Sequence, residues 1–122
     1  GVNTAKRGML TPEARKRLVE DVFRGEERVE VVTYTSLTGD LARELGAGTI
    51  IRSVRNATDF EYERTIERAN RHIFPELKTI ILLAPVEVEH ISSSLVRELR
   101  AFGHDVAELM PEGVVLEDYI KD

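Results

Sequence analysis

The chain has 122 residues, of which 42% are hydrophobic and 32% charged, which predicts one soluble domain, residues 1–122, with a packed core. Its net charge of −5 argues against a general nucleic-acid surface but permits a local basic cluster that binds a small anion. Cysteine, an apolar run of membrane-spanning length and a signal-peptide pattern are all absent from the sequence, so we expect a cytoplasmic protein without disulfides or thiol chemistry.

The start of the chain predicts a loop, a helix and a strand. Residues 1–10 read as the end of a strand that runs into a glycine-containing loop, so we expect a further segment to precede them. Thr11 is a suitable N-cap, and Pro12 a suitable first residue, for a helix over residues 12–23. The short β-branched segment 28–35 predicts a strand.

The middle of the chain alternates helix and strand. A helix over residues 36–45 is expected to end at Gly46, and residues 48–54 predict a strand. Apolar residues at helical spacing predict a long helix over residues 59–74. The nearly all-apolar residues 77–85 predict a strand that is buried on both faces, as in a parallel sheet covered by helices.

The remaining residues predict a helix after the serines at 92–94 and a last helical stretch after Pro111. The alternation of strands and helices predicts a doubly wound, Rossmann-like α/β fold with a parallel sheet and helices on both faces. Ligands bind such sheets beyond the carboxyl ends of the strands. We expect three polar loops there, at residues 3–10, 52–59 and 85–94.

The stretch "HISSSLVREL" places Ser92, Ser93 and Ser94 directly before an amphipathic segment. A helix needs a single N-cap, so the additional hydroxyls call for another explanation. Because a helix N-terminus presents unpaired N–H groups and the positive end of the helix dipole, hydroxyls there favour an anion such as phosphate. The alternative is a polar cap with two solvated neighbours, and the stretch by itself does not decide between them.

Two arginines, Arg52 and Arg55, lie at the end of a predicted strand. A planar guanidinium can bind phosphate oxygens bidentately, and Lys6 of the first loop would add positive charge. The alternative is an ordinary ion pair with Asp59 or Glu63, which lie four residues apart at the start of the next helix. These two carboxylates could also form an acid/base pair, but acidic residues are common in the first turn of a helix.

The three histidines, His72, His90 and His104, do not have the spacing of metal ligands, so we expect no metal site built from them. His90 adjoins the serines and could contact a nucleotide, with a solvated loop histidine as the alternative. The sequence contains neither the glycine-flanked serine of a hydrolase nor a Walker-type "GKS" or "GKT" motif.

Four stretches, "NTAKRGMLTPEAR", "IIRSVRNATDFEYE", "NRHIFPEL" and "ISSSLVREL", together resemble bacterial phosphopantetheine adenylyltransferase, a family of nucleotidyltransferases, over essentially the whole chain. The resemblance implies that ATP and 4′-phosphopantetheine give dephospho-coenzyme A and pyrophosphate, a step of coenzyme A biosynthesis, without a covalent intermediate. It further implies Mg²⁺ as the cofactor, a homo-hexamer and feedback inhibition by coenzyme A.

The same resemblance implies roles for individual residues. Lys6 corresponds to the loop lysine near the reacting phosphates, Arg52 to the arginine that contacts phosphopantetheine, and Thr38 to a backbone contact in the pantetheine site. The implied ATP-binding residues are Ser53, Val54, Arg55, Glu63, Val88, Glu89, His90, Ile91, Ser92, Ser93 and Ser94. On this interpretation, the three serines form a triphosphate cradle at a helix N-terminus.

The sequence departs from the family's pattern in several places. Ser53 stands where glycine is usual, and Val88 where an aromatic residue is common. The family's first strand and glycine-rich turn, with a "T-x-G-H" signature whose histidine stabilises the transferring phosphate, have no counterpart here. We therefore expect that a strand-helix unit, on the order of 30 residues, is missing at the start, and that the chain alone is inactive.

Two alternative functions follow from the same residues. One is a sister adenylyl- or cytidylyltransferase with another acceptor, against which the "DFEYE" segment argues. The other is a non-catalytic fragment that binds a nucleotide but transfers nothing.

Overall fold

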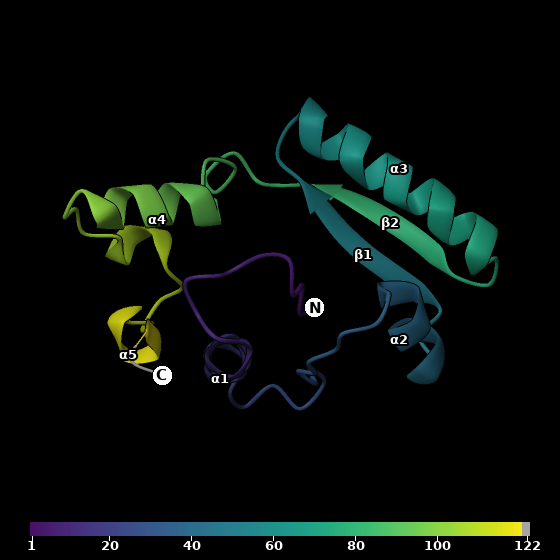
Figure 1. Cartoon of the computed structure of the whole chain (residues 1–122), viewed down its shortest axis with the longest axis horizontal. Helices are drawn as coiled ribbons and strands as arrows, with labels where there is room; N and C mark the ends of the chain where they lie inside the picture. The colour runs from purple at the N-terminus through teal and green to yellow at the C-terminus, as the bar shows by residue number, and fades with distance from the viewer. Residues whose placement is uncertain (121–122) are drawn as a thin grey trace. The chain divides into compact units, whose positions relative to one another are not determined.

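Helices and strands follow one another along the chain in the computed structural model, which describes residues 1–120 (Figure 1). By their internal contacts these residues form a sheet unit, Ser36–His90, and a helical unit, which comprises Gly1–Thr35 and the described residues from Ile91 onward. The elements are α1 (Pro12–Val22), α2 (Thr38–Glu44), β1 (Thr49–Val54), α3 (Ala57–Ile73), β2 (Lys78–Leu83), α4 (Ser93–Ala101), the 3₁₀ turn η1 (Ala107–Leu109) and α5 (Glu117–Ile120).

The sheet unit is built on the parallel strands β1 and β2. They pair in register from Thr49 opposite Lys78 to Val54 opposite Leu83. Parallel strands need a long crossover connection, and here α3 supplies it and contacts both strands. The predicted α/β class with a parallel sheet is thus confirmed, as are the helices and strands predicted between residues 36 and 85.

A small apolar core lies near the amino ends of the two strands. Phe74 is 1% exposed and packs with Ala42, Leu77 and Ile50. The α2 residue Gly39 lies so close to the Phe74 ring that a Cβ atom there would be 2.2 Å from Cε2. The backbone of α2 can approach the ring this closely because residue 39 has no side chain.

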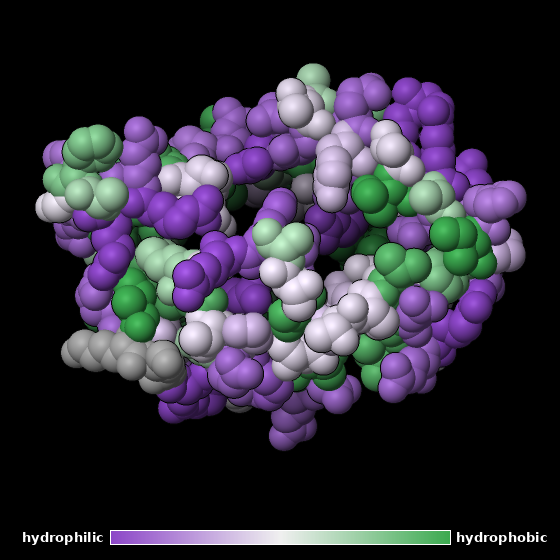
Figure 2. Space-filling model, viewed as in Figure 1, coloured by the Kyte–Doolittle hydropathy of each residue, from purple (hydrophilic) through white to green (hydrophobic). Residues whose placement is uncertain are grey.

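The expected burial of β2 on both faces is wrong for the described residues. Ile80 and Leu82 are about half exposed, and Leu83 is 82% exposed. Hydrophobic residues are accordingly visible at the surface of the sheet unit (Figure 2). The physical reason is that exposed and half-buried residues alternate along β2, as in a strand that is covered on one face, and α3 is a helix of the sheet unit that contacts it.

The helical unit has its own core, formed by Val96, Val106 and Leu116. The first and last helices, α1 and α5, are joined by a hydrogen bond from the Tyr119 hydroxyl to Asp21 Oδ2 at 2.7 Å. This bond lowers the pKa of Asp21 and raises that of Tyr119. The predicted helices after Thr11, after the serines and after Pro111 are confirmed.

The strand predicted over residues 28–35 is not formed. This segment makes one backbone hydrogen bond to the start of the chain, from the Val2 N–H to the Tyr34 carbonyl at 2.8 Å. β-Branched residues favour extended backbone, but a strand exists only where a partner completes the ladder of hydrogen bonds. Within the described part of the chain, this segment lacks such a ladder.

Candidate functional site

A cavity of about 450 Å³ opens in the sheet unit at the carboxyl ends of both strands. Its position follows from the parallel pairing, which brings the last residues of β1 and β2 to the same edge of the sheet. The Ala84 N–H continues the pairing by donating to the Val54 carbonyl at 2.8 Å. The cavity is lined by Val54, Arg55, Asn56, Ala57, Phe60, Leu83, Ala84, Val86 and Glu89.

The turn from β1 into α3 forms one wall of this cavity. Asn56 is the N-cap of α3, and its side-chain oxygen accepts a hydrogen bond from the Asp59 N–H at 2.9 Å. Both Asn56 and Arg55 face the cavity. The first turn of a helix presents unpaired N–H groups, so this wall combines a guanidinium with the positive end of a helix dipole, while the carboxylate of Glu89 also lines the cavity.

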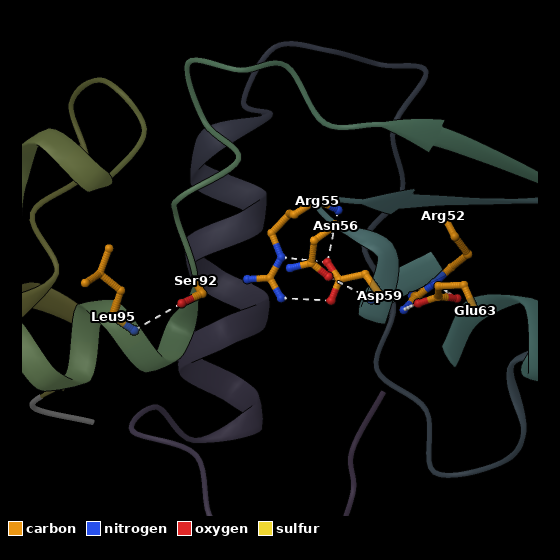
Figure 3. A network of polar contacts seen from close by, with 7 residues as sticks. All are labelled: Arg52, Arg55, Asn56, Asp59, Glu63, Ser92 and Leu95. Carbon is orange, nitrogen blue, oxygen red and sulfur yellow. Dashed lines mark hydrogen bonds and ion pairs between the residues drawn. The ribbon is translucent and has the colours of Figure 1, made fainter. Parts of the chain in front are cut away.

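Arg55 is held against Asp59 by three hydrogen bonds (Figure 3). Its backbone N–H and its Nε donate to Asp59 Oδ2 at 3.0 and 2.8 Å, and its Nη2 donates to Oδ1 at 3.1 Å. The hydrogen bonds from the Arg55 side chain, followed by that from its backbone, lower the pKa of Asp59 to about 2. The same pairing raises the pKa of Arg55, so both groups are charged near neutral pH.

Arg52, a residue of β1, forms a second pair with Glu63, which lies one helical turn after Asp59 on α3. Its Nε and Nη2 donate to the two carboxylate oxygens of Glu63 at 3.0 and 2.7 Å (Figure 3). Glu63 is buried, at 7% exposed, whereas about half of the Arg52 side chain is exposed. The ion pairs that the sequence left open as an alternative are therefore present.

The triple serine lies in the helical unit, at the start of α4. Ser92 is the N-cap, and its hydroxyl accepts a hydrogen bond from the Leu95 N–H at 3.1 Å (Figure 3). Ser94 accepts a hydrogen bond from Arg97 Nη2 at 3.2 Å, and both Ser93 and Ser94 are exposed. One serine thus serves as the cap, and two further hydroxyls are accessible at the same helix N-terminus.

The other implied site residues lie at the surface. Lys6 is exposed in the turn that follows Asn3, and Thr38 is the exposed first residue of α2. Ser53, Val88 and His90 are exposed, and Ile91 is half-buried. Of the implied ATP-binding residues, the cavity brings together Val54, Arg55 and Glu89, while Glu63 contacts Arg52 instead.

Sequence reasoning missed several residues of the cavity. Asn56 had a usable signal, because an asparagine directly before an acidic helix start is a typical N-cap. Phe60, Leu83 and Val86 had none, since apolar residues that line a cavity cannot be told from core residues before the fold is known. Among residues 1–120, no group of three or more histidine, aspartate or glutamate side chains is arranged to hold a metal ion.

In the same described part of the chain, no helix has both the length and the apolar character needed to cross a membrane.

The parallel strands, the crossover helix and the cavity at the strand ends agree with a family model described as cytidylyltransferase-like, which matches residues 2–99. The class of the protein is therefore that of the nucleotidyltransferases.

Comparison with individual proteins narrows this class. The chain is 40% identical over 117 residues to a phosphopantetheine adenylyltransferase of Porphyromonas gingivalis. The aligned residues make up 96% of this chain and 76% of the relative. It is 42% identical to the phosphopantetheine adenylyltransferase of Flavobacterium psychrophilum (93% and 75% covered) and 41% identical to that of Lactobacillus johnsonii (98% and 74% covered). The chain belongs to the phosphopantetheine adenylyltransferase family.

Proposed function

We propose that the enzyme to which this chain belongs binds ATP and 4′-phosphopantetheine and transfers the adenylyl group between them, giving dephospho-coenzyme A and pyrophosphate. Its family membership makes it a nucleotidyltransferase of coenzyme A biosynthesis. The observation that supports the proposed site best is the cavity at the strand ends, where Arg55 and the first turn of α3 form a wall suited to phosphate.

The reaction is a displacement at the α-phosphorus of ATP. A phosphate oxygen of 4′-phosphopantetheine attacks in line, a new P–O bond forms, and the bond to the β-phosphate oxygen breaks as pyrophosphate leaves. Such a transfer needs no covalent intermediate, so the contribution of the protein is to position the two anions and to neutralise charge.

The proposed roles of the residues are those that the family resemblance implies. Arg52 would bind the phosphate of 4′-phosphopantetheine, with Thr38 and Lys6 as further contacts to that substrate. Arg55 would bind ATP phosphates, and Val54 and Glu89 would line the nucleotide site. Among the implied residues, Ser53, Glu63 and residues 88–94 complete the proposed ATP site, with Lys6 near the reacting phosphates.

Mg²⁺ fits this proposal as part of the substrate, because ATP phosphates carry their own oxygen ligands for the ion. The described residues present no cluster of metal-ligating side chains, so we assign no protein ligands to it. A homo-hexamer and inhibition by coenzyme A are part of the proposal and come from the family resemblance. The proposed cytoplasmic location comes from the sequence, which contains no cysteine.

The two arginines give a direct test by titration calorimetry with each substrate. Arg52→Ala should weaken binding of 4′-phosphopantetheine, and Arg55→Ala binding of ATP, each by about tenfold or more, since a charge-assisted hydrogen bond contributes roughly 1.5–3 kcal/mol. Because Arg52→Ala leaves the Glu63 carboxylate buried and unpaired, Arg52→Lys serves as a second variant that keeps the charge.

A matched control lies in the last turn of α3, where Arg71 pairs with Glu67 at 2.7 Å and is largely exposed. Arg71→Ala removes an equal charge away from the cavity and should leave both affinities unchanged. Wild-type affinities in both the Arg52 and the Arg55 variants would refute the proposed site.

A further inference from the structure

We propose that Asn56 acts at both ends of its side chain: the oxygen caps α3, and the amide group donates a hydrogen bond to a phosphate oxygen of ATP. This inference rests on the proposed function, because it takes the cavity at the strand ends as part of the ATP site. The family resemblance assigns no role to Asn56. The cavity points to it, because Asn56 lines that cavity together with Arg55.

The polar atoms of the Asn56 side chain differ in their contacts. The oxygen accepts a hydrogen bond from the Asp59 N–H at 2.9 Å, as an N-cap does, so the side chain is attached to the first turn of α3 (Figure 3). The amide nitrogen has only N–H donors to offer. These donors make no hydrogen bond to the described residues 1–120, and Asn56 is exposed, so a ligand in the cavity can reach them.

The surroundings of this amide favour an anion. Arg55 supplies a guanidinium to the same cavity, and α3 begins directly after Asn56, with the positive end of its dipole. The remaining polar residue of the cavity lining, Glu89, is an acceptor and repels an anion. Binding of phosphate in this cavity therefore depends on the donors that Arg55, Asn56 and the helix start supply.

The alternative is that Asn56 only caps α3. A cap stabilises its helix, and capping by itself requires no contact with a ligand. The two roles can be separated because serine is about as good an N-cap as asparagine, whereas alanine is a poor one. Asn56→Ser thus removes the amide and keeps the cap, while Asn56→Ala removes both.

The experiment measures ATP affinity by titration calorimetry and stability by urea denaturation. We expect Asn56→Ser to weaken ATP binding by about tenfold or more, because a hydrogen bond to a charged group is lost, and to unfold at the same urea concentration as the wild type. Asn56→Ala should weaken ATP binding to a similar extent and also unfold at a lower urea concentration. Asn56→Thr, which also retains a hydroxyl cap, replaces Asn56→Ser if that variant does not fold.

A control variant and a control ligand accompany these measurements. Thr11 is the N-cap of α1, accepts a hydrogen bond from the Ala14 N–H, and is not among the residues that line the cavity. Thr11→Ala should therefore lose stability, as Asn56→Ala does, but keep the ATP affinity of the wild type. Adenosine has no phosphate, so as a competitor of ATP it should bind to the wild type and to Asn56→Ser equally well.

The outcomes distinguish this inference from the proposed function. If Arg55→Ala leaves ATP affinity unchanged, the proposed ATP site fails, and the inference with it. If Arg55→Ala weakens ATP binding but Asn56→Ser does not, the inference alone is refuted. A loss of ATP affinity in Asn56→Ala but not in Asn56→Ser would show that only the cap matters. An equal loss for adenosine would place the amide against the nucleoside, and either result would also refute the inference.

Discussion

Gly39→Ala is the substitution for which local propensity and tertiary packing predict opposite results. Gly39 is a buried residue of α2, and alanine in a helix is normally more stable than glycine by about 0.5–1 kcal/mol. In this structure, however, an added Cβ would lie 2.2, 2.3 and 2.8 Å from three ring atoms of Phe74. Carbon atoms at their best separation are about 3.5–4.0 Å apart, so helix and ring must separate by more than about 1 Å.

The expected result is a loss of stability. Phe74 is 1% exposed and packs against Ala42 and Leu77, so the ring has little room to move. Overpacking of a filled core costs about 1–3 kcal/mol. After subtraction of the gain in helix propensity, the free energy of unfolding should fall by about 1–2 kcal/mol. Urea denaturation followed by circular dichroism measures this change from the midpoint at constant slope.

Gly48→Ala is the matched control. A Cβ at residue 48 meets nothing within 4 Å, and Gly48 is not among the glycines with positive φ, so alanine there should be neutral or slightly stabilising. A second control, the double variant Gly39→Ala with Phe74→Leu, removes most of the ring and should lose less stability than the sum of its single changes. If Gly39→Ala is as stable as the wild type, the close contact between α2 and Phe74 does not exist.

Three further predictions concern the serines at the start of α4 and the pair of Asp59 with Arg55. Ser92→Ala removes the α4 cap and should lower the free energy of unfolding by about 1 kcal/mol in urea denaturation, and an unchanged value would mean that another group caps the helix. Ser93→Asp should keep α4 folded but weaken ATP binding in calorimetry, because a carboxylate would face the phosphates. Undiminished affinity would remove Ser93 from the proposed site. The pKa of Asp59 lies at about 2 rather than 3.8, so its pair with Arg55 adds stability above about pH 4 that disappears as the pH falls through 2. The difference in stability between wild type and Asp59→Asn should therefore shrink over this range, and a constant difference would contradict the pairing.

The sequence by itself determined the features that depend on neighbours a few residues away. The Thr11 hydroxyl accepts from the Ala14 N–H at 3.1 Å, as expected of an N-cap three residues before it. Gly46 ends α2 with φ +70°, a backbone conformation that glycine adopts readily. The alternation of helices and strands also depends on local sequence, because side-chain periodicity within a segment distinguishes helices from strands. The carboxyl ends of the strands could therefore be recognised as the place for a ligand.

Only the tertiary structure decided which side chains meet. Both arginines and both carboxylates were visible in the sequence, but their pairing depends on the angle at which α3 leaves β1. The strand expected at residues 28–35 depends on a partner that no local pattern can supply. The contact between Gly39 and Phe74 joins residues 35 positions apart, and the cavity joins the ends of two strands. Such contacts are set by the packing of whole elements, and periodicity within one element carries no information about them.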